Sequence, residues 1–294
     1  MNNYKIQKIE KANYPLLLQQ ISRLPETMDM IGSLPSDDNK FLCVIGSRDF
    51  SFYGRDACRK LLNGLQGYPI VIVSGLALGI DSIAHEIALE SGLKTISFPG
   101  SGLGDSIIHP SSKRNLAKKI VTSGGALLSP FEIDQLGTNW TFPTRNRLMA
   151  GASHATLIIE ARHRSGTLIT ADYAAEFGRD IMVVPGSIFS DLSYGPHMLM
   201  RRGAIPVASS DDILEALGFR IKRKDGPSPA LPNFREMSLS NEEREIVNSL
   251  RSQNLSSSDL IEKVSLSPSR FNTAISELEL QGIIKSENDI YSLA

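Results

Sequence analysis

Short apolar runs alternate with helical patterns over residues 41–218 of the chain. The runs are rich in Val, Ile and Leu, which is typical of strands buried on both faces of a parallel sheet. This alternation predicts an α/β protein with an extended Rossmann-like fold and a mostly parallel sheet. Strands are expected at 41–45, 70–73, 95–98, 126–128, 156–159, 181–184 and 205–208. Helices are expected at 55–65, 80–91, 112–122, 145–152, 166–177, 197–202 and 211–217.

The flanking segments have a different character. Residues 1–40 form a lead-in to the α/β domain of 41–218 and end in a polar stretch. Residues 219–237 contain three prolines, which cannot continue a helix, so an extended linker is expected there. Residues 238–294 have the outline of a small winged helix-turn-helix domain. Its helices are expected at 242–250, 258–264 and 269–281, and its strands at 282–284 and 289–293.

Composition narrows the class of protein. The 294 residues are 41% hydrophobic and 21% charged, as in an ordinary globular protein. No apolar run reaches the roughly 18 residues of a membrane span, and the first residues lack the apolar stretch of a signal peptide, so a cytoplasmic protein is expected. Cys43 and Cys58 have no metal-ligand spacing, and we expect two buried thiols and no metal site. With 31 basic and 32 acidic residues, any nucleic-acid site must be a local concentration of charge.

Glycines follow each of the first three predicted strands, at 46–48, at Ser74-Gly75 and at Gly100. The carboxyl ends of parallel strands meet at one edge of an open α/β sheet, where ligands bind. Backbone amides at the following helix starts can bind an anion there. A single glycine turn is commonly structural, but three at one edge favour a phosphate-type ligand. The chain has neither a Walker P-loop nor a dinucleotide motif after the first strand, so no cofactor is expected.

Two arginines begin the helix expected at 145–152. Arg145 and Arg147 suit bidentate contact with phosphate, although for either of them an internal salt bridge is an equal alternative. Residues 165–167 add hydroxyls and amides at another expected helix start. Aromatic side chains near these turns could stack on unpaired bases, although packing is the favoured role for each of them. These aromatic residues are Phe50, Tyr53, Trp140 and Phe142.

Together these motifs resemble the DprA/Smf family of DNA-processing proteins over about residues 14–217. The matching stretches are Gly46-Ser47-Arg48, Ser74-Gly75-Leu76-Ala77, Phe142-Pro143, Arg145-Asn146-Arg147, Ser165-Gly166-Thr167 and Pro185-Gly186, in family order. The resemblance implies a homodimer that binds single-stranded DNA in a basic pocket and loads a RecA-type recombinase in recombination or transformation. By motif, it implies DNA contacts from Arg48, Ser74, Gly75, Arg145, Asn146, Arg147, Ser165, Gly166 and Thr167.

The chain departs from the family pattern in three places. Residues 129–139 stand where an acidic turn rich in proline and glycine is usual. His109-Pro110 replaces the usual Tyr-Pro, and Pro99 follows the third strand. These departures indicate a divergent branch, for which an adaptor role in a defence or phage system is an alternative.

An enzyme is the other alternative. Asp81 and His85 are four residues apart on one expected helix face and could form an acid/base pair. A helix-capping aspartate and a buried histidine are favoured instead. The chain has no G-x-S-x-G motif, and residues 123–126 lack most of the signature of related nucleoside-monophosphate hydrolases. Binding of DNA without catalysis is therefore the prediction.

The C-terminal domain carries little positive charge. Residues 235–294 contain ten acidic and six basic residues. Affinity for duplex DNA depends on several phosphate contacts, which this balance does not favour. A protein-contact role is therefore expected for the winged helix, in place of duplex reading.

Overall fold

The computed structural model describes residues 5–221, 239–250, 254–264, 266–280, 283–287 and 289–293. The chain divides into two compact units, Met1–Ile221 and Lys222–Ala294. Most of the linker expected at 219–237 lies outside the described residues. Within the described residues, no helix is long and apolar enough to cross a bilayer.

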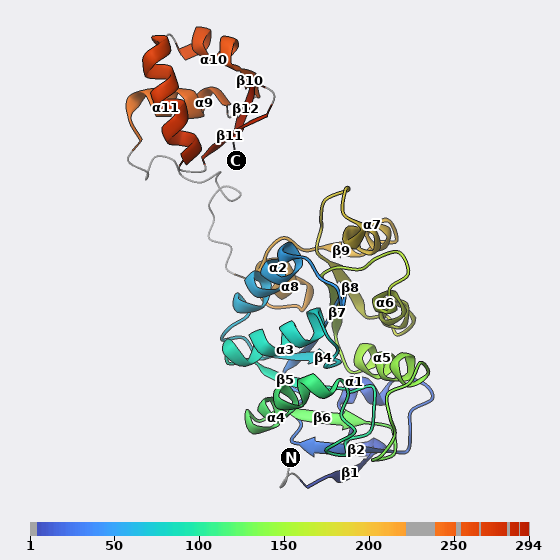
Figure 1. The fold of residues 1–294 in the computed structure, drawn as a ribbon. Coiled ribbons are helices and arrows are strands. Elements are labelled where there is room, and N and C mark those ends of the chain that lie inside the picture. The colour runs from blue at the N-terminus through green and yellow to red at the C-terminus, as the bar shows by residue number, and fades with distance from the viewer. Residues whose placement is uncertain are drawn as a thin grey trace. The chain divides into compact units, whose positions relative to one another are not determined.

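The first unit is built on a nine-stranded sheet. Figure 1 shows its strands running through the middle of this unit, between the helices. The strand order is β1-β2-β6-β5-β4-β3-β7-β8-β9, and the strands from β3 to β9 pair in parallel. These seven strands confirm the predicted α/β fold. They are β3 (Lys40–Ile45), β4 (Ile70–Ser74), β5 (Lys94–Ser97), β6 (Ala126–Ser129), β7 (Ala155–Ile158), β8 (Asp180–Val183) and β9 (Ile205–Pro206).

The lead-in supplies two further strands that sequence patterns did not predict. β1 (Gln7–Glu10) and β2 (Thr27–Gly32) are antiparallel, and β2 pairs with β6. Met28 and Met30 of β2 are buried in the core beside β6, while Ile9 is the one buried residue of β1. The two strands of the lead-in are therefore part of the sheet and extend its edge.

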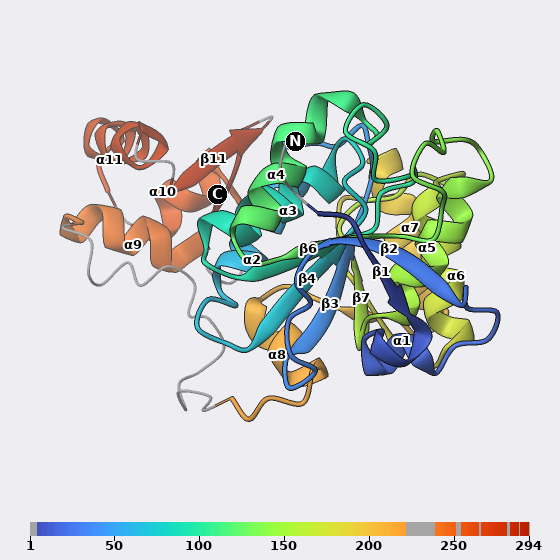
Figure 2. The same cartoon turned by 90° about the horizontal axis from the view of Figure 1, so that it is seen from below.

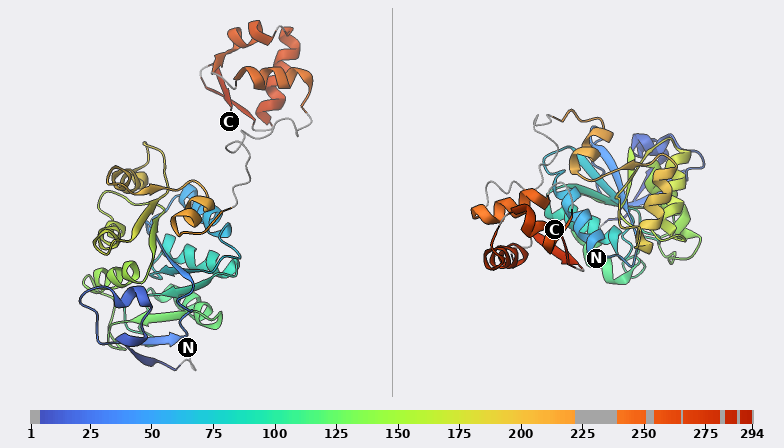
Figure 3. Two further views of the ribbon diagram at one scale, coloured as in Figure 1. Left: turned by 180° about the vertical axis from the view of Figure 1, so that it is seen from behind. Right: turned by 90° about the horizontal axis from the view of Figure 1, so that it is seen from above.

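Helices cover both faces of the sheet (Figures 2 and 3). Alternate residues of β3 enter different layers: Phe41 and Cys43 pack with the α5–α7 side, and Leu42 and Val44 pack with the α2–α3 side. One layer contains α1 (Leu16–Gln19), α5 (Thr141–Gly151), α6 (Gly166–Glu176) and α7 (Tyr194–Arg201). The other contains α2 (Phe52–Asn63), α3 (Ile80–Glu90), α4 (Arg114–Thr122) and α8 (Ser210–Ala216). Three short 3-10 helices are η1 (Lys11–Asn13), η2 (Ser111–Lys113) and η3 (Asp191–Ser193).

Both cysteines are buried and free, as expected. Cys43 lies on β3 and Cys58 on α2. Burial raises the pKa of the Cys58 thiol to about 12, so this thiol stays protonated at neutral pH. The two cysteines act as small apolar residues in the two layers.

The second unit is the expected winged helix-turn-helix with a core of its own. Its apolar positions recur at helical spacing, so that Ile246, Leu260, Phe271 and Leu278 share one buried cluster. The strand expected at 282–284 instead runs from residue 284 onward. The elements are α9 (Asn241–Leu250), β10 (Leu255–Ser256), α10 (Ser257–Val264), α11 (Pro268–Leu280), β11 (Ile284–Glu287) and β12 (Ile290–Leu293).

Candidate nucleic-acid interface

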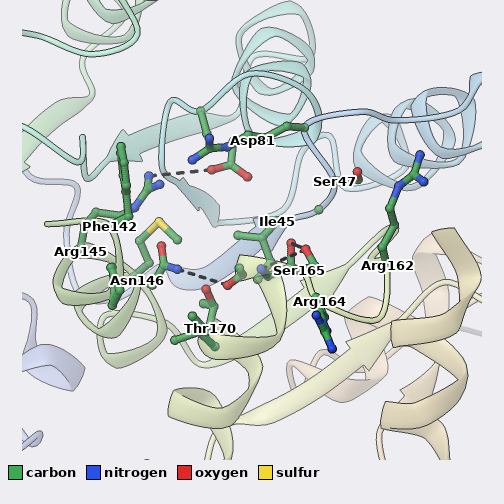
Figure 4. Close-up of a pocket in the computed structure, with 18 of the residues that line it drawn as sticks. Ile45, Ser47, Asp81, Phe142, Arg145, Asn146, Arg162, Arg164, Ser165 and Thr170 are labelled. Carbon is green, nitrogen blue, oxygen red and sulfur yellow. Dashed lines mark hydrogen bonds and ion pairs between the residues drawn. The ribbon is translucent and has the colours of Figure 1, made fainter. Parts of the chain in front are cut away.

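A pocket of ≈ 510 Å³ opens at the carboxyl edge of the sheet (Figure 4). Its walls come from the end of β3, the turn before α3, the first turns of α5 and the start of α6. Of the three predicted glycine turns, residues 46–48 line this cavity, while Gly75 and Gly100 line a smaller adjoining one. Four arginines and two aspartates line the larger cavity: Arg48, Arg145, Arg162, Arg164, Asp49 and Asp81.

The pocket brings together six of the nine predicted contact residues, namely Arg48, Arg145, Asn146, Ser165, Gly166 and Thr167. Gly75 lines an adjoining pocket of ≈ 110 Å³ together with Arg48 and Arg145. Ser74 faces away, because its fully buried hydroxyl donates to the Val44 carbonyl at 2.7 Å.

Arg147 lies on the opposite flank of α5 from this pocket. The helix begins at Thr141, four residues before the expected start, so residues 145 and 147 are both well inside it. Successive helical residues are rotated by about 100°, and two steps turn Arg147 away from Arg145. Its guanidinium donates to the carbonyls of Ser22 and Arg23, the second at 3.1 Å.

Arg145 is nearly buried and mainly holds the pocket together. Its Nη1 donates to the Phe98 carbonyl at 3.0 Å and to the Gly75 carbonyl, and lies 3.8 Å from Asp81 Oδ2. Burial lowers the pKa of Arg145, while Asp81 opposes this. The internal ion pair weighed as an alternative for this arginine is therefore present, and part of its charge is offset.

Gly75 is required by this arrangement. A Cβ at residue 75 would lie 1.4 Å from Nη1 of Arg145 and 2.7 Å from Oδ2 of Asp81. No side chain can occupy that volume without moving the ion pair. The sequence pattern marked Gly75 as a site of close ligand approach. In the structure, Gly75 also leaves the space that the Arg145 guanidinium occupies.

The other arginines that line the pocket are more accessible to a ligand than Arg145. Arg48 is exposed, and its guanidinium lies 5.3 Å from the centroid of the Phe142 ring. Arg162 pairs with Asp49 at 2.6 Å on the surface. Arg48 and Arg164 form no ion pair with any residue that the structure describes. Sequence reasoning missed Arg162 and Arg164, although both directly precede the Ser165-Gly166-Thr167 motif.

The start of α6 forms the far wall of the pocket. Ser165 caps the helix by accepting from the Thr167 amide at 3.2 Å. Asn146 Nδ2 donates to the Gly166 carbonyl at 3.4 Å and links α5 to this helix start. The positive end of the α6 dipole therefore lies beside the exposed arginines and favours an anion there.

Asp81 and His85 have structural partners. Burial raises the pKa of Asp81, while Arg145 and the nearby backbone of Gly75 and Ala77 oppose this. His85 is fully buried, and its Nδ1 lies 2.7 Å from the Thr95 hydroxyl, which itself donates to a carbonyl. Burial lowers the pKa of His85 to about 3, so the ring is neutral at physiological pH. Within the described residues, no group of three or more His, Cys, Asp and Glu side chains could hold a metal ion.

Comparison with known families covers both units. Residues 5–218 match the family model of DNA recombination-mediator protein A. Residues 243–285 match a model described as winged helix-turn-helix DNA-binding.

Curated relatives match the first unit. Protein Smf of Escherichia coli is 38% identical over 217 residues, which are 74% of this chain and 58% of that protein. DNA processing protein DprA of Streptococcus pneumoniae is 37% identical over 206 residues, covering 70% of this chain and 72% of that one. The chain thus spans less than two thirds of the Escherichia coli relative.

Solved structures agree with this match. The X-ray structure of DprA from Streptococcus pneumoniae has a TM-score of 0.67 at 36% identity, covering 74% of this chain and 75% of that one. DNA processing protein A of Helicobacter pylori, described for its single-stranded DNA binding mode, has a TM-score of 0.65 at 26% identity. That match covers 73% of this chain and 96% of the other. The chain belongs to the DprA/Smf family of DNA-processing proteins.

Proposed function

We propose that this protein binds single-stranded DNA in the pocket at the carboxyl edge of the sheet and performs no reaction on it. The observation that carries the proposal is the pair of exposed guanidinium groups, Arg48 and Arg164, beside the start of α6. Arginine contacts phosphate through charge-assisted hydrogen bonds. A helix start adds backbone donors and a favourable dipole.

The charge of the pocket supports a polyanionic ligand. Its four arginines and two aspartates give a net charge of +2, although the whole chain has a net charge of −1. The local concentration of charge that the balanced composition demands is therefore present at this edge. Such a site attracts a phosphate backbone and weakens as salt screens it.

Apolar surface inside the pocket favours unpaired bases over a duplex. The half-buried Phe142 ring and the exposed Ile169 both line the cavity. Only an unpaired strand can turn its bases onto such surfaces while its phosphates meet the arginines. A titration of labelled single-stranded and duplex oligonucleotides at rising salt tests this proposal, and tighter binding of the duplex would contradict it.

The proposed function is binding without catalysis. The Asp81 carboxylate reaches the pocket, but it is paired with Arg145. His85 contacts Thr95 in the core and lies outside the residues that line the pocket. Release of free base from nucleoside monophosphates, abolished in Asp81→Ala, would favour the nucleotide-hydrolysing alternative.

The partners of the protein are also part of the proposal. A homodimer is supported by exposed apolar side chains that follow β8, because Ile188 is 82% and Phe189 93% exposed. Loading of a RecA-type recombinase in the cytoplasm rests on the family resemblance. We assign a protein-contact role to the winged-helix unit, because its excess of acidic residues does not favour contact with DNA phosphates. Co-purification with a recombinase and the mass of the protein in solution test these points.

A further inference from the structure

A second pocket, of ≈ 460 Å³, lies on the other flank of α5. Trp140, Thr144 and Arg147 line it at positions i, i+4 and i+7, which share one face of a helix start. Arg145 and Asn146 point to the first pocket from the same turns. A helix with its side chains is about 10–12 Å across, so the two pockets are neighbours on either side of the α5 start.

Trp140 gives the second pocket an accessible aromatic surface. The residue is 57% exposed, although tryptophan is usually well buried. Its ring meets the buried Phe131 ring edge-to-face, with 5.4 Å between centroids and 85° between planes. This contact anchors the indole and leaves more than half of the residue free for another flat ring.

A positive charge adjoins this ring. Arg147 donates to the Arg23 carbonyl at 3.1 Å and thereby fixes the backbone of Arg23, whose φ is +52°. The Arg23 side chain is exposed, lines the pocket and forms no ion pair with a described residue. Glu132 is the one acidic residue among those that line the cavity. The pocket therefore pairs a stacking surface with an available cation.

We infer that this pocket is a nucleotide subsite, in which a base stacks on Trp140 and a flanking phosphate contacts Arg23. The inference rests on the proposed function, because the nucleotide belongs to the strand held in the first pocket. A strand that crosses the start of α5 passes from Asn139 and Phe142 in the first pocket to Trp140 in the second. Stacking tolerates any base, so the subsite adds affinity without sequence preference.

The test uses the fluorescence of Trp140, which is the one tryptophan of the chain. Oligothymidylates of increasing length are titrated into the full-length protein. Lengths that fill the first pocket alone leave the emission unchanged, and longer ones quench it as a base stacks on the indole. In parallel, anisotropy of labelled oligonucleotides gives affinities for Trp140→Ala and Trp140→Phe.

Trp140→Ala is expected to lose about tenfold in affinity for the longer oligonucleotides and none for the shortest. Trp140→Phe keeps a stacking ring and retains most of the affinity. Leu136→Ala is the matched control, because Leu136 is 61% exposed on the same segment and lines neither pocket. Arg23→Gln keeps Trp140 and reduces the salt dependence for the longer oligonucleotides by roughly one phosphate contact.

Three results overturn the inference, and they separate it from the proposed function. Binding of long oligonucleotides without quenching, at equal affinity for wild type and Trp140→Ala, removes the subsite and leaves the first pocket intact. Absence of any single-stranded DNA binding by the wild type overturns both the subsite and the proposed function. Normal DNA binding by Trp140→Ala together with loss of a protein partner assigns the second pocket to protein docking.

Discussion

Asp81 and Arg145 form a buried ion pair beneath the first pocket, with 3.8 Å between Oδ2 and Nη1. Their side chains are 8% and 5% exposed, respectively. The pair joins the first turn of α3 to α5, and Arg145 also donates to the carbonyls of Gly75 after β4 and Phe98 after β5. The two residues that looked like candidates for chemistry or for phosphate thus hold the walls of the pocket in place.

Removing one residue of the Asp81–Arg145 ion pair should lower the free energy of unfolding. Asp81→Ala leaves the Arg145 charge buried without its counterion, and breaking such a pair costs about 3–5 kcal/mol. Urea unfolding should show this loss. Asp49→Ala is the control, because Asp49 pairs with Arg162 at the surface with 83% of its side chain exposed, where pairs contribute about 0–1 kcal/mol. Equal stabilities of the two variants would contradict a structural role for Asp81.

The buried His85 predicts a pH dependence of stability. Its pKa of about 3 in the folded protein lies below the ordinary 6.5, so the unfolded chain binds more protons between these values. The free energy of unfolding should therefore fall as pH drops from about 6.5 toward 3, by up to about 1.4 kcal/mol per unit from this residue.

Other groups also titrate in this range. The raised pKa of Asp81 acts in the opposite direction just above the ordinary aspartate value, and the lowered pKa of His154 acts in the same direction as His85. The difference between wild type and His85→Gln isolates the contribution of His85. Parallel stability curves for the two proteins would show that His85 is not held neutral by the fold.

Alanine substitutions at two glycines of the site should have different effects on stability. Gly75→Ala places a Cβ against Arg145 and Asp81 and should destabilise the fold by about 1–3 kcal/mol through overpacking. It should also weaken DNA binding by moving the pocket wall. Gly166→Ala, at the start of α6, meets no atom within 4 Å and should leave stability unchanged or slightly higher. Thermal denaturation of both variants is the measurement, and a Gly75→Ala variant as stable as Gly166→Ala would contradict the packing argument.

Apolar patterning predicted the parallel sheet because its central strands, such as β3, β4 and β7, are buried on both faces and bounded by turns. The same reasoning did not find β1, since an edge strand with Ile9 as its one buried residue has no such pattern. It also did not find β2, although Met28, Met30 and Ile31 are buried there. The start of α5 was placed too late, because Pro143 is compatible with a first helical turn as well as with a preceding loop.

The arginine pair was also misjudged, because both residues were treated as part of one helix start. Spacing alone puts Arg145 and Arg147 near a helix start, but the helix rotation sends them to opposite flanks. Burial could not be read from the sequence either, so Arg145 looked as available for phosphate as Arg48. The arginines that the fold leaves available in the first pocket are Arg48 and Arg164, and the second was not predicted.

The most direct test of the proposed function is the salt dependence of single-stranded DNA binding by wild type and by the Arg48→Ala/Arg164→Ala double variant. If both guanidinium groups meet phosphate, affinity should fall by roughly 1–3 kcal/mol. The slope of log affinity against log salt should shrink by about 1.4, at about 0.7 per phosphate. Arg55→Ala/Arg59→Ala is the control, because these two arginines of α2 line neither of the two pockets beside α5.

The control should bind with the wild-type affinity and slope, and the folded Arg48/Arg164 variant should show both losses. Wild-type affinity and slope in that variant would contradict the assignment of single-stranded DNA to this pocket.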